Sequence, residues 1–251
     1  MLELRSVSLT LSNDNGSSKE ILNNINLTLE DGKFYAVTGP NGGGKTSLAK
    51  IIMGIYQPTQ GRIYYKGEDI TDLSITERSK KGIVYAFQQP PRFKGIGVKD
   101  LLRIAANDTL SEKDYHCILR DVGLCPEDYL NREVSASLSG GEVKRIEIAT
   151  LLARPGEMLI FDEPEAGVDL WTLQQLVTVI IEHHHRRNRT TLAITHNERF
   201  LSVADEVLLL AEGEVRARGN RDKVWPLIKD DITCQWRQRC GGEASDLNCY
   251  R

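Results

Sequence analysis

The 251-residue chain lacks the features of a secreted or membrane-spanning protein. No apolar run approaches the length that spans a bilayer. The opening residues Met-Leu-Glu-Leu-Arg-Ser lack the basic start and apolar core of a secretion signal. The five cysteines are an odd number without disulfide-framework spacing, which favours a reducing compartment. We therefore expect a cytoplasmic protein, and if it serves a membrane machine, the spanning part is another chain.

An excess of positive charge is also absent. The chain has 32 Lys and Arg residues against 35 Asp and Glu residues, a formal net charge of −3. A duplex-binding surface usually shows a basic excess or a basic stripe. We therefore expect no nucleic-acid partner.

A glycine-rich stretch fits the phosphate-binding pattern G-x-x-x-x-G-K-[ST] without a mismatch. The apolar stretch before it, Lys33 to Thr38, predicts a buried strand, and Ser47 to Met53 after it predicts a helix. In that setting, loop N–H groups and a helix N-terminus point at phosphate oxygens, Lys45 reaches the β- and γ-phosphates, and the Thr46 hydroxyl meets Mg²⁺. We predict that the protein binds a nucleoside triphosphate here. The predicted binding residues are Gly39, Pro40, Asn41, Gly42, Gly43, Gly44, Lys45, Thr46 and Ser47.

Two further apolar strands end in groups suited to nucleotide chemistry. Met158 to Phe161 is followed by Asp162 and Glu163, and Thr190 to Thr195 is followed by His196. Because α/β sheets place ligands at the carboxyl ends of parallel strands, we expect these side chains to face the nucleotide. Asp162 is expected to hold Mg²⁺ with the loop threonine, and Glu163 to accept a proton from the attacking water.

A second glycine pair lies at Ser139-Gly140-Gly141, before a helix predicted from Val143 to about Arg154. Ser139 alone would support only an ordinary capped helix start. The two glycines let the backbone approach a ligand, which favours a second anion-seeking helix N-terminus.

The order of patterns predicts an α/β fold. Alternating strands at residues 2–11 and 21–29 precede the phosphate loop, and a final hairpin is expected over residues 203–218. We predict one domain over residues 1–229, with a helical subdomain inserted at about 89–137. The tail, residues 230–251, carries Cys234, Cys240 and Cys249, which we interpret as free thiols in a mobile tail; the alternative is docking on a partner or thiolate ligation.

Three consecutive histidines, His183 to His185, suggest metal binding at first sight. Adjacent helix residues point ~100° apart, so three in a row cannot share a face. We interpret this segment as a solvated helix end.

The motifs together, in this order, resemble the ATP-binding-cassette (ABC) ATPases over nearly the whole chain. Residues 39–46 match the family's Walker A motif, Gln88 its Q-loop, and Leu138-Ser-Gly-Gly-Glu142 its signature without a mismatch. Residues 158–162 match Walker B, residues 166–169 correspond to the D-loop, and His196 corresponds to the switch histidine. The resemblance implies the ABC ATPase fold, in which a phosphate-loop parallel core sheet carries an N-terminal antiparallel β layer and an inserted helical subdomain.

The resemblance also implies a mechanism that hydrolyses ATP with Mg²⁺. Glu163 matches the family's catalytic glutamate, Gln88 would position metal and water, and His196 would contact the γ-phosphate. Two cassettes would face head to tail, so that Ser139 and Gly141 of one copy reach the γ-phosphate held by the other. One departure is that Leu11 stands nearest to the place where the family commonly has an aromatic residue that stacks on adenine.

Three stretches are similar to the SUF iron–sulfur cluster assembly ATPases (SufC type). They are the basic pair and glutamate in residues 142–147, the acid Glu165 after Asp162-Glu-Pro, and residues 86–90 with Gly95. In that branch the cassette would drive a SufB-like scaffold through ATP-dependent dimerisation. The alternative is the nucleotide-binding subunit of an ABC transporter, whose transmembrane permease would be a separate chain.

Overall fold

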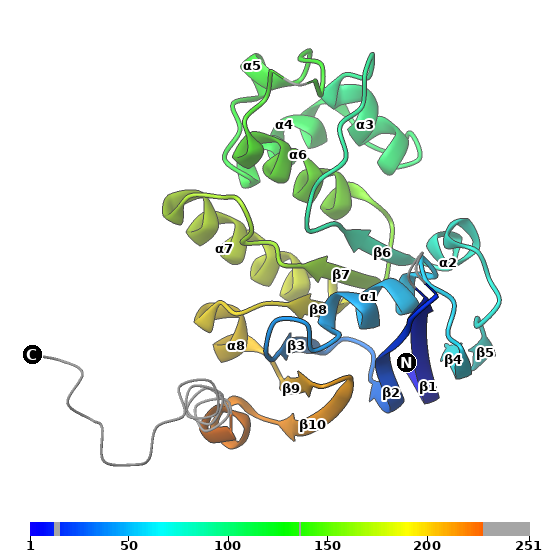
Figure 1. Ribbon diagram of the computed structural model, residues 1–251. Helices are drawn as coiled ribbons and strands as arrows, with labels where there is room; N and C mark the ends of the chain where they lie inside the picture. Colours follow the sequence, from blue (N-terminus) through cyan, green and yellow to red (C-terminus); the bar gives the residue numbers. More distant parts are fainter. Residues whose placement is uncertain (13–15, 136, 228–251) are drawn as a thin grey trace, which may run out of the picture.

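The computed structural model describes residues 1–12, 16–135 and 137–227, and it contains two β-sheets (Figure 1). One sheet is four-stranded in the order β2-β1-β4-β5, and the other is six-stranded in the order β10-β9-β3-β8-β7-β6. The strands of the first sheet are β1 (Leu2–Ser12), β2 (Ser18–Leu29), β4 (Gln60–Tyr65) and β5 (Glu68–Asp69). Those of the second are β3 (Phe34–Thr38), β6 (Ile83–Ala86), β7 (Met158–Asp162), β8 (Thr190–Ile194), β9 (Glu206–Ala211) and β10 (Glu214–Gly219).

The four-stranded sheet is antiparallel throughout, whereas five strands of the larger sheet run parallel and only β10 joins antiparallel. Every residue of β3, β7 and β8 is buried, as expected of strands covered on both faces. Because parallel strands end at one edge, Thr38, Asp162 and Ile194 lead into the phosphate loop, Glu163 and His196 from the same side. The predicted parallel core and N-terminal antiparallel layer are confirmed.

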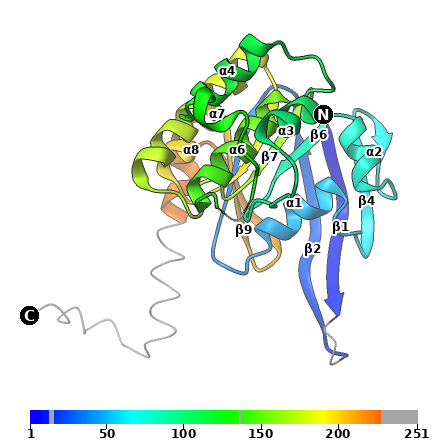
Figure 2. The same ribbon diagram turned by 90° about the horizontal axis from the view of Figure 1, so that it is seen from above.

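Helices cover both faces of the parallel sheet. They are α1 (Lys45–Met53), α2 (Ile75–Lys80), α3 (Val98–Ala105), α4 (Glu112–Asp121), α5 (Pro126–Tyr129), α6 (Gly140–Ala153), α7 (Leu170–Arg187) and α8 (Glu198–Val203). Figures 1 and 2 show α1 between the two sheets, where its buried Leu48, Ile51 and Ile52 share one apolar core with both. A second core lies on the other face, under α6 and α7. Figure 1 shows α3, α4 and α5 gathered with α6, so the predicted helical segment packs against the helix that follows the glycine pair.

A buried arginine on α2, a helix not predicted above, fixes the end of α1. Arg78 is 0% exposed and donates hydrogen bonds to Ile51 O at 2.6 Å and Ile52 O at 3.0 Å. Because these carbonyls close the last turn of α1, the guanidinium supplies donors that the helix end lacks. The helix whose first residues are Lys45 and Thr46 is therefore held at its far end as well.

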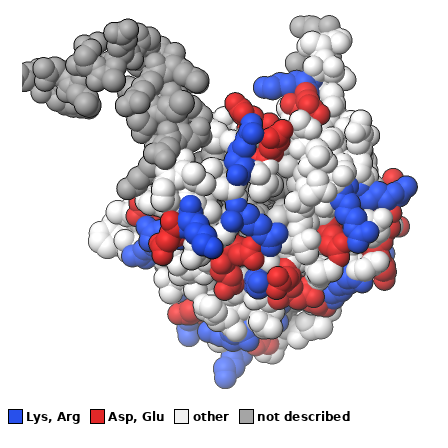
Figure 3. Space-filling view, turned by 90° about the horizontal axis from the view of Figure 1, so that it is seen from below, with Lys and Arg blue, Asp and Glu red and all other residues white. Residues whose placement is uncertain are grey.

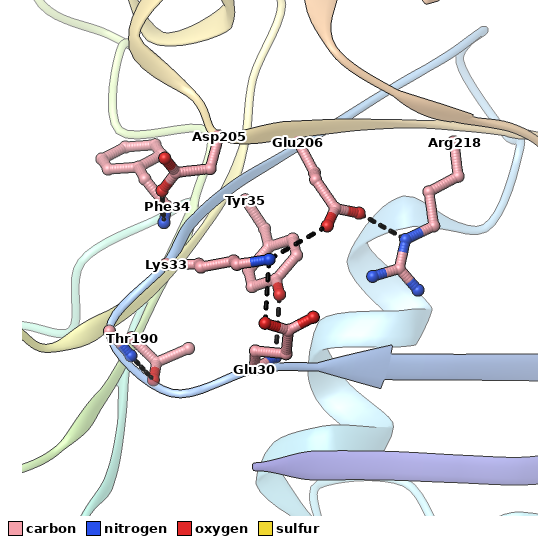
Figure 4. A network of polar contacts seen from close by, with 9 residues as sticks. Glu30, Lys33, Phe34, Tyr35, Thr190, Asp205, Glu206 and Arg218 are labelled. Atoms are coloured by element: carbon pink, nitrogen blue, oxygen red, sulfur yellow. Dashed lines mark hydrogen bonds and ion pairs between the residues drawn. The ribbon is translucent and has the colours of Figure 1, made fainter.

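A polar network holds the sheet at the amino-terminal ends of its parallel strands, opposite the phosphate loop (Figure 4). Lys33 lies 2.9 Å from a carboxylate oxygen of Glu30 and 3.6 Å from one of Glu206, which also pairs with Arg218. The Tyr35 hydroxyl accepts a 2.7 Å hydrogen bond from the Glu30 backbone. The contacts of Lys33 and Tyr35 fix where β3 begins, five residues before the phosphate loop. On the face of the molecule seen in Figure 3, basic and acidic side chains are also interspersed.

The interpretation of the three histidines as a solvated helix end is wrong. His184 is 5% exposed, its Nδ1 lies 3.0 Å from Thr191 Oγ1, and its ring meets Phe34 edge-on with centroids 5.2 Å apart. Only His185 is exposed, because the last turns of α7 still lie on the sheet. The tail cysteines Cys234, Cys240 and Cys249 lie outside the described residues. Among the residues that the structure describes, no helix has the length and apolar character to cross a membrane.

Candidate active site

The phosphate loop leaves β3 through a glycine that no other residue could replace without rearrangement. Gly39 has φ +142°, and a Cβ built there would lie 1.9 Å from Leu210 O. At the other end of the loop, Gly44 has φ +99° and forms the N-cap of α1. The loop is therefore shaped by left-handed backbone and by close contact with β9. Lys45 and Thr46 follow as the first residues of the helix.

The Lys45 ammonium turns back onto its own loop. Nζ donates to Gly39 O at 2.8 Å and to Pro40 O at 3.0 Å, and the residue is 6% exposed. Burial lowers the Lys45 pKa, while the nearby Glu163 and Asp162 carboxylates raise it. A phosphate oxygen at the loop would offer this cation a stronger, charged acceptor than the two carbonyls.

Thr46 and Asp162 meet across the sheet edge with their oxygen atoms 3.0 Å apart. Asp162 is 1% exposed, and its second oxygen accepts a 2.6 Å hydrogen bond from the Tyr85 hydroxyl. Burial raises the Asp162 pKa, and the Tyr85 and Thr46 hydroxyls lower it. A hydroxyl and a carboxylate oxygen are hard donors that suit Mg²⁺, so the residues present fit that ion. When bound here, Mg²⁺ would screen charge on the phosphates.

Glu163 projects from the end of β7 with an unusual backbone. Its φ is +47°, in a left-handed region that costs a non-glycine residue of order 1–3 kcal/mol. Its Oε2 accepts a 2.6 Å hydrogen bond from Nε2 of Gln88, which follows β6. The structure thus brings the predicted base and the predicted Q-loop residue into direct contact.

His196 is placed by Glu165, a residue for which the sequence offered only a family comparison. Oε1 of Glu165 accepts from Thr195 Oγ1 at 2.6 Å and from the His196 backbone N–H at 2.9 Å. Burial lowers the His196 pKa, and Lys45 lowers it further, against opposing effects of Glu163 and Glu165. The lowered pKa favours the neutral imidazole, and the effect of Lys45 shows that the ring lies within electrostatic reach of the phosphate loop.

A recess of about 260 Å³ opens over the phosphate loop. Lys19 and Ile21 of β2 form one wall, and no local signal in the sequence marks them as part of the site. The remaining lining residues are Asn41, Gly42, Gly44, Lys45, Thr46, Ser47 and Glu163.

Ser139, Gly140 and Gly141 do not line this recess. Ser139 caps α6 in a capping box, in which Glu142 Oε2 accepts from the Ser139 N–H at 2.7 Å. A Cβ on Gly140 would lie 3.7 Å from Gly167 O, so the glycine pair is next to the loop of residues 166–169. Within one chain, the glycine pair therefore lies outside the recess over the phosphate loop.

Comparisons with known proteins agree with this geometry. A family model described as ABC transporter matches residues 22–166, more than half of the chain. The chain is 40% identical over 222 residues to an uncharacterized ABC transporter ATP-binding protein of Methanocaldococcus jannaschii, covering 85% of this chain and 88% of that one. It is 34% identical over 228 residues to the iron-sulfur cluster assembly protein SufC of Plasmodium berghei, covering 84% and 62%. Over 227 residues it is 34% identical to the energy-coupling factor transporter ATP-binding protein EcfA1 of Mycoplasma mobile, covering 88% and 80%.

The same fold occurs in a dimeric, post-hydrolysis ATP-binding cassette bound to ADP and Pi. That structure has a TM-score of 0.78 at 24% identity and covers 88% of this chain and 99% of its own. The chain therefore belongs to the ABC transporter family, as an ATP-binding cassette ATPase that uses ATP and Mg²⁺.

Proposed function

We propose that this chain is the ATPase subunit of a multi-chain machine, in which two copies pair head to tail around two ATP molecules and act on a separate partner protein. The observation that carries this proposal is that the two helix N-termini predicted to bind anions, those of α1 and α6, lie apart within one chain. Lys45 and Thr46 line the phosphate recess, whereas Ser139 and Gly141 lie outside it. A second copy that presents its glycine pair to the recess would complete each site.

The residues divide the work by the groups they present. Lys45 and the loop N–H groups stabilise charge on the phosphates, and Thr46 and Asp162 hold Mg²⁺. Gln88 contacts Glu163 directly and positions water and metal, Glu163 polarises the water, and His196 reaches the γ-phosphate.

The separate partner has a suitable place to dock beside Gln88. An apolar pocket of about 210 Å³ lies between the residues that follow β6 and the helices α3 and α6. Phe87 and Phe93 line it and are still 41% and 39% exposed. An apolar or aromatic side chain of a partner would fill this pocket and contact the residue next to Gln88.

A SufB-like scaffold is one candidate partner. Two of the stretches that resemble SufC-type ATPases touch each other here, because Glu147 Oε1 accepts a 2.7 Å hydrogen bond from the Phe87 backbone. The similarity to SufC of Plasmodium berghei supports the same candidate. In this case the work would be done in the cytoplasm on an iron–sulfur cluster scaffold.

A transmembrane permease is the other candidate. The names of the relatives from Methanocaldococcus jannaschii and Mycoplasma mobile favour it, since both are transporter ATP-binding proteins. The permease would be a separate chain that seats on the same apolar pocket.

Affinity capture of the full chain from its native cells separates the candidates. Capture without detergent of a soluble protein that can be reconstituted with an iron–sulfur cluster would support the scaffold. Recovery only from detergent-solubilised membranes, bound to a multi-span protein, would support the permease. If the Glu163→Gln variant stays monomeric in the presence of Mg-ATP, the two-copy mechanism is overturned for either partner.

A further inference from the structure

Two buried side chains of α6 hold both backbone polar groups of Phe87. Oε1 of Glu147 accepts from the Phe87 N–H at 2.7 Å, and Nζ of Lys144 donates to the Phe87 carbonyl at 2.6 Å. The two side chains also pair with each other, with Lys144 Nζ and Glu147 Oε2 3.1 Å apart. Lys144 and Glu147 side chains are only 1% and 11% exposed. We call this arrangement the Phe87 clamp.

The position of Phe87 explains why a clamp is useful there. Strand β6 is one of the two edge strands of the sheet and ends at Ala86, so Phe87 is the first residue beyond the ladder. Backbone groups that leave a sheet next to a packed helix need new partners. The pair supplies one acceptor and one donor to the same residue.

The clamp is energetically expensive as mere packing. Removing an ammonium and a carboxylate from water carries a desolvation penalty that their mutual attraction must offset. Burial raises the Glu147 pKa, and the nearby Lys144 ammonium opposes that rise. The surrounding face of α6 is apolar, with Val143, Ile146 and Leu151 all buried, so the ion pair is matched to the two Phe87 backbone groups and not to its surroundings.

The residue after the clamp makes the contact that matters for hydrolysis. Gln88 follows Phe87, and its Nε2 donates to Oε2 of Glu163 at 2.6 Å. The helix that supplies the clamp begins at Gly140, within the glycine pair expected to meet the ATP of a second copy. A continuous series of contacts therefore runs from the start of α6, through Phe87 and Gln88, to the proposed base.

We propose that Lys144 and Glu147 are positioning residues, which fix the Phe87 backbone so that Gln88 reaches Glu163 and thereby link the position of α6 to ATP hydrolysis. This inference rests on the proposed roles of Gln88 and Glu163. It assigns no contact with ATP to Lys144 or Glu147 themselves.

A double-mutant cycle tests the link, with steady-state ATP hydrolysis by the full chain as the readout. Lys144→Met and Glu147→Gln each remove charge while keeping most of the side-chain volume. Each is expected to lower kcat about tenfold and to change KM for ATP less than about threefold, as for a group that acts on the transition state. In a Gln88→Ala background the same substitutions should cause no further loss, because the residue they position is gone.

Arg145→Met is the matched control. Arg145 lies on the same helix and also donates to a backbone carbonyl, that of Gly123 at 3.0 Å, but it contacts neither Phe87 nor the apolar pocket. Its kcat should stay within about twofold of wild type. If Lys144→Met does not fold, Glu147→Gln still decides the matter, because a single amide oxygen cannot both accept from the Phe87 N–H and pair with the Lys144 ammonium.

The outcomes separate the inference from the function on which it rests. If Gln88→Ala alone hydrolyses ATP like wild type, the proposed role of Gln88 fails. If Gln88→Ala is impaired but the clamp substitutions lower kcat equally in both backgrounds, only the clamp is overturned. The same holds if folded clamp variants keep wild-type kcat.

Discussion

The side-chain amide of Gln88 donates a 2.6 Å hydrogen bond to the carboxylate of Glu163, although the two residues lie 75 positions apart and follow different strands. An amide donor on Oε2 leaves Oε1 of the carboxylate for a water. It also leaves the Gln88 carbonyl oxygen for a metal ion. The pair therefore has the two acceptors that water activation beside Mg²⁺ requires.

Glu163→Gln should slow hydrolysis while sparing ATP binding. A glutamine keeps the shape and can still meet Gln88, but it cannot take a proton from water. General-base contributions are of order 10²–10⁴, so kcat should fall at least about 100-fold. Turnover is measured by phosphate release, ATP affinity by titration, and dimer by size-exclusion chromatography with light scattering.

Glu198→Gln is the control for that substitution, since Glu198 is an exposed glutamate two residues after His196. It should turn over ATP like wild type. Wild-type turnover by Glu163→Gln would instead show that another group is the base.

Substitution of the proposed metal ligand should change the demand for Mg²⁺. Asp162→Asn keeps the volume but removes the charge 3.0 Å from the Thr46 hydroxyl. The Mg²⁺ concentration for half-maximal turnover should rise at least about tenfold, and chelation should stop turnover in wild type. Hydrolysis is followed during Mg²⁺ titration at fixed ATP.

Tyr85→Phe provides the comparison, because it removes only the hydroxyl that donates to the other Asp162 oxygen. Its Mg²⁺ demand should change less than that of Asp162→Asn. An Asp162→Asn protein with wild-type Mg²⁺ demand would contradict the assignment of this carboxylate to the metal.

The sequence predicted the parts of the site that depend on local patterns. The phosphate loop is a contiguous motif, and the strands that deliver Asp162 and His196 are apolar runs with polar ends. The helix α2 was not predicted, although Ser74 and Glu77 form a capping box whose S-x-x-E spacing is a local signal for a helix start.

Contacts between segments that lie far apart in the chain could not be predicted from the sequence. Glu165 braces the Thr195 hydroxyl from 30 positions away, and Glu147 reaches Phe87 from 60. Neither residue type nor spacing indicates such pairs, because only the packing of α6 and β7 against their neighbours brings them together. The burial of His184 was missed for the same reason: its position on the helix surface depends on how α7 rests on the sheet.

An exposed tryptophan offers a direct signal for the proposed pairing of two copies. Trp171 is 80% exposed, and its neighbour Leu170 is 66% exposed, at the start of α7 directly after residues 166–169. That loop lies next to Gly140 at the nucleotide edge of the sheet. We expect Trp171 to be covered in the two-copy state.

The measurement uses Glu163→Gln in a Trp225→Phe, Trp236→Phe background, which leaves one tryptophan. Addition of Mg-ATP should shift the emission to shorter wavelength and reduce quenching by acrylamide severalfold. Without nucleotide the spectrum should stay that of an exposed indole. A dimer peak with an unchanged spectrum would show that Trp171 lies outside the contact.

Acid should destabilise the fold through His183. Burial, followed by the Arg189, Arg187 and Arg186 charges, lowers the His183 pKa to about 4, against roughly 6.5 in the unfolded chain. Between those values the unfolded state binds the extra proton, so the free energy of unfolding falls as pH drops from 6.5 towards 4, by at most ~3 kcal/mol for this partly buried ring. Urea unfolding at pH 7.5, 6.0 and 5.0 measures how the free energy of unfolding changes with pH.

His183→Gln should have a shallower pH dependence than wild type, and His185→Gln, at an exposed ring, should keep the wild-type slope. Equal slopes for wild type and His183→Gln would mean that other groups, including the buried His184, govern the acid transition.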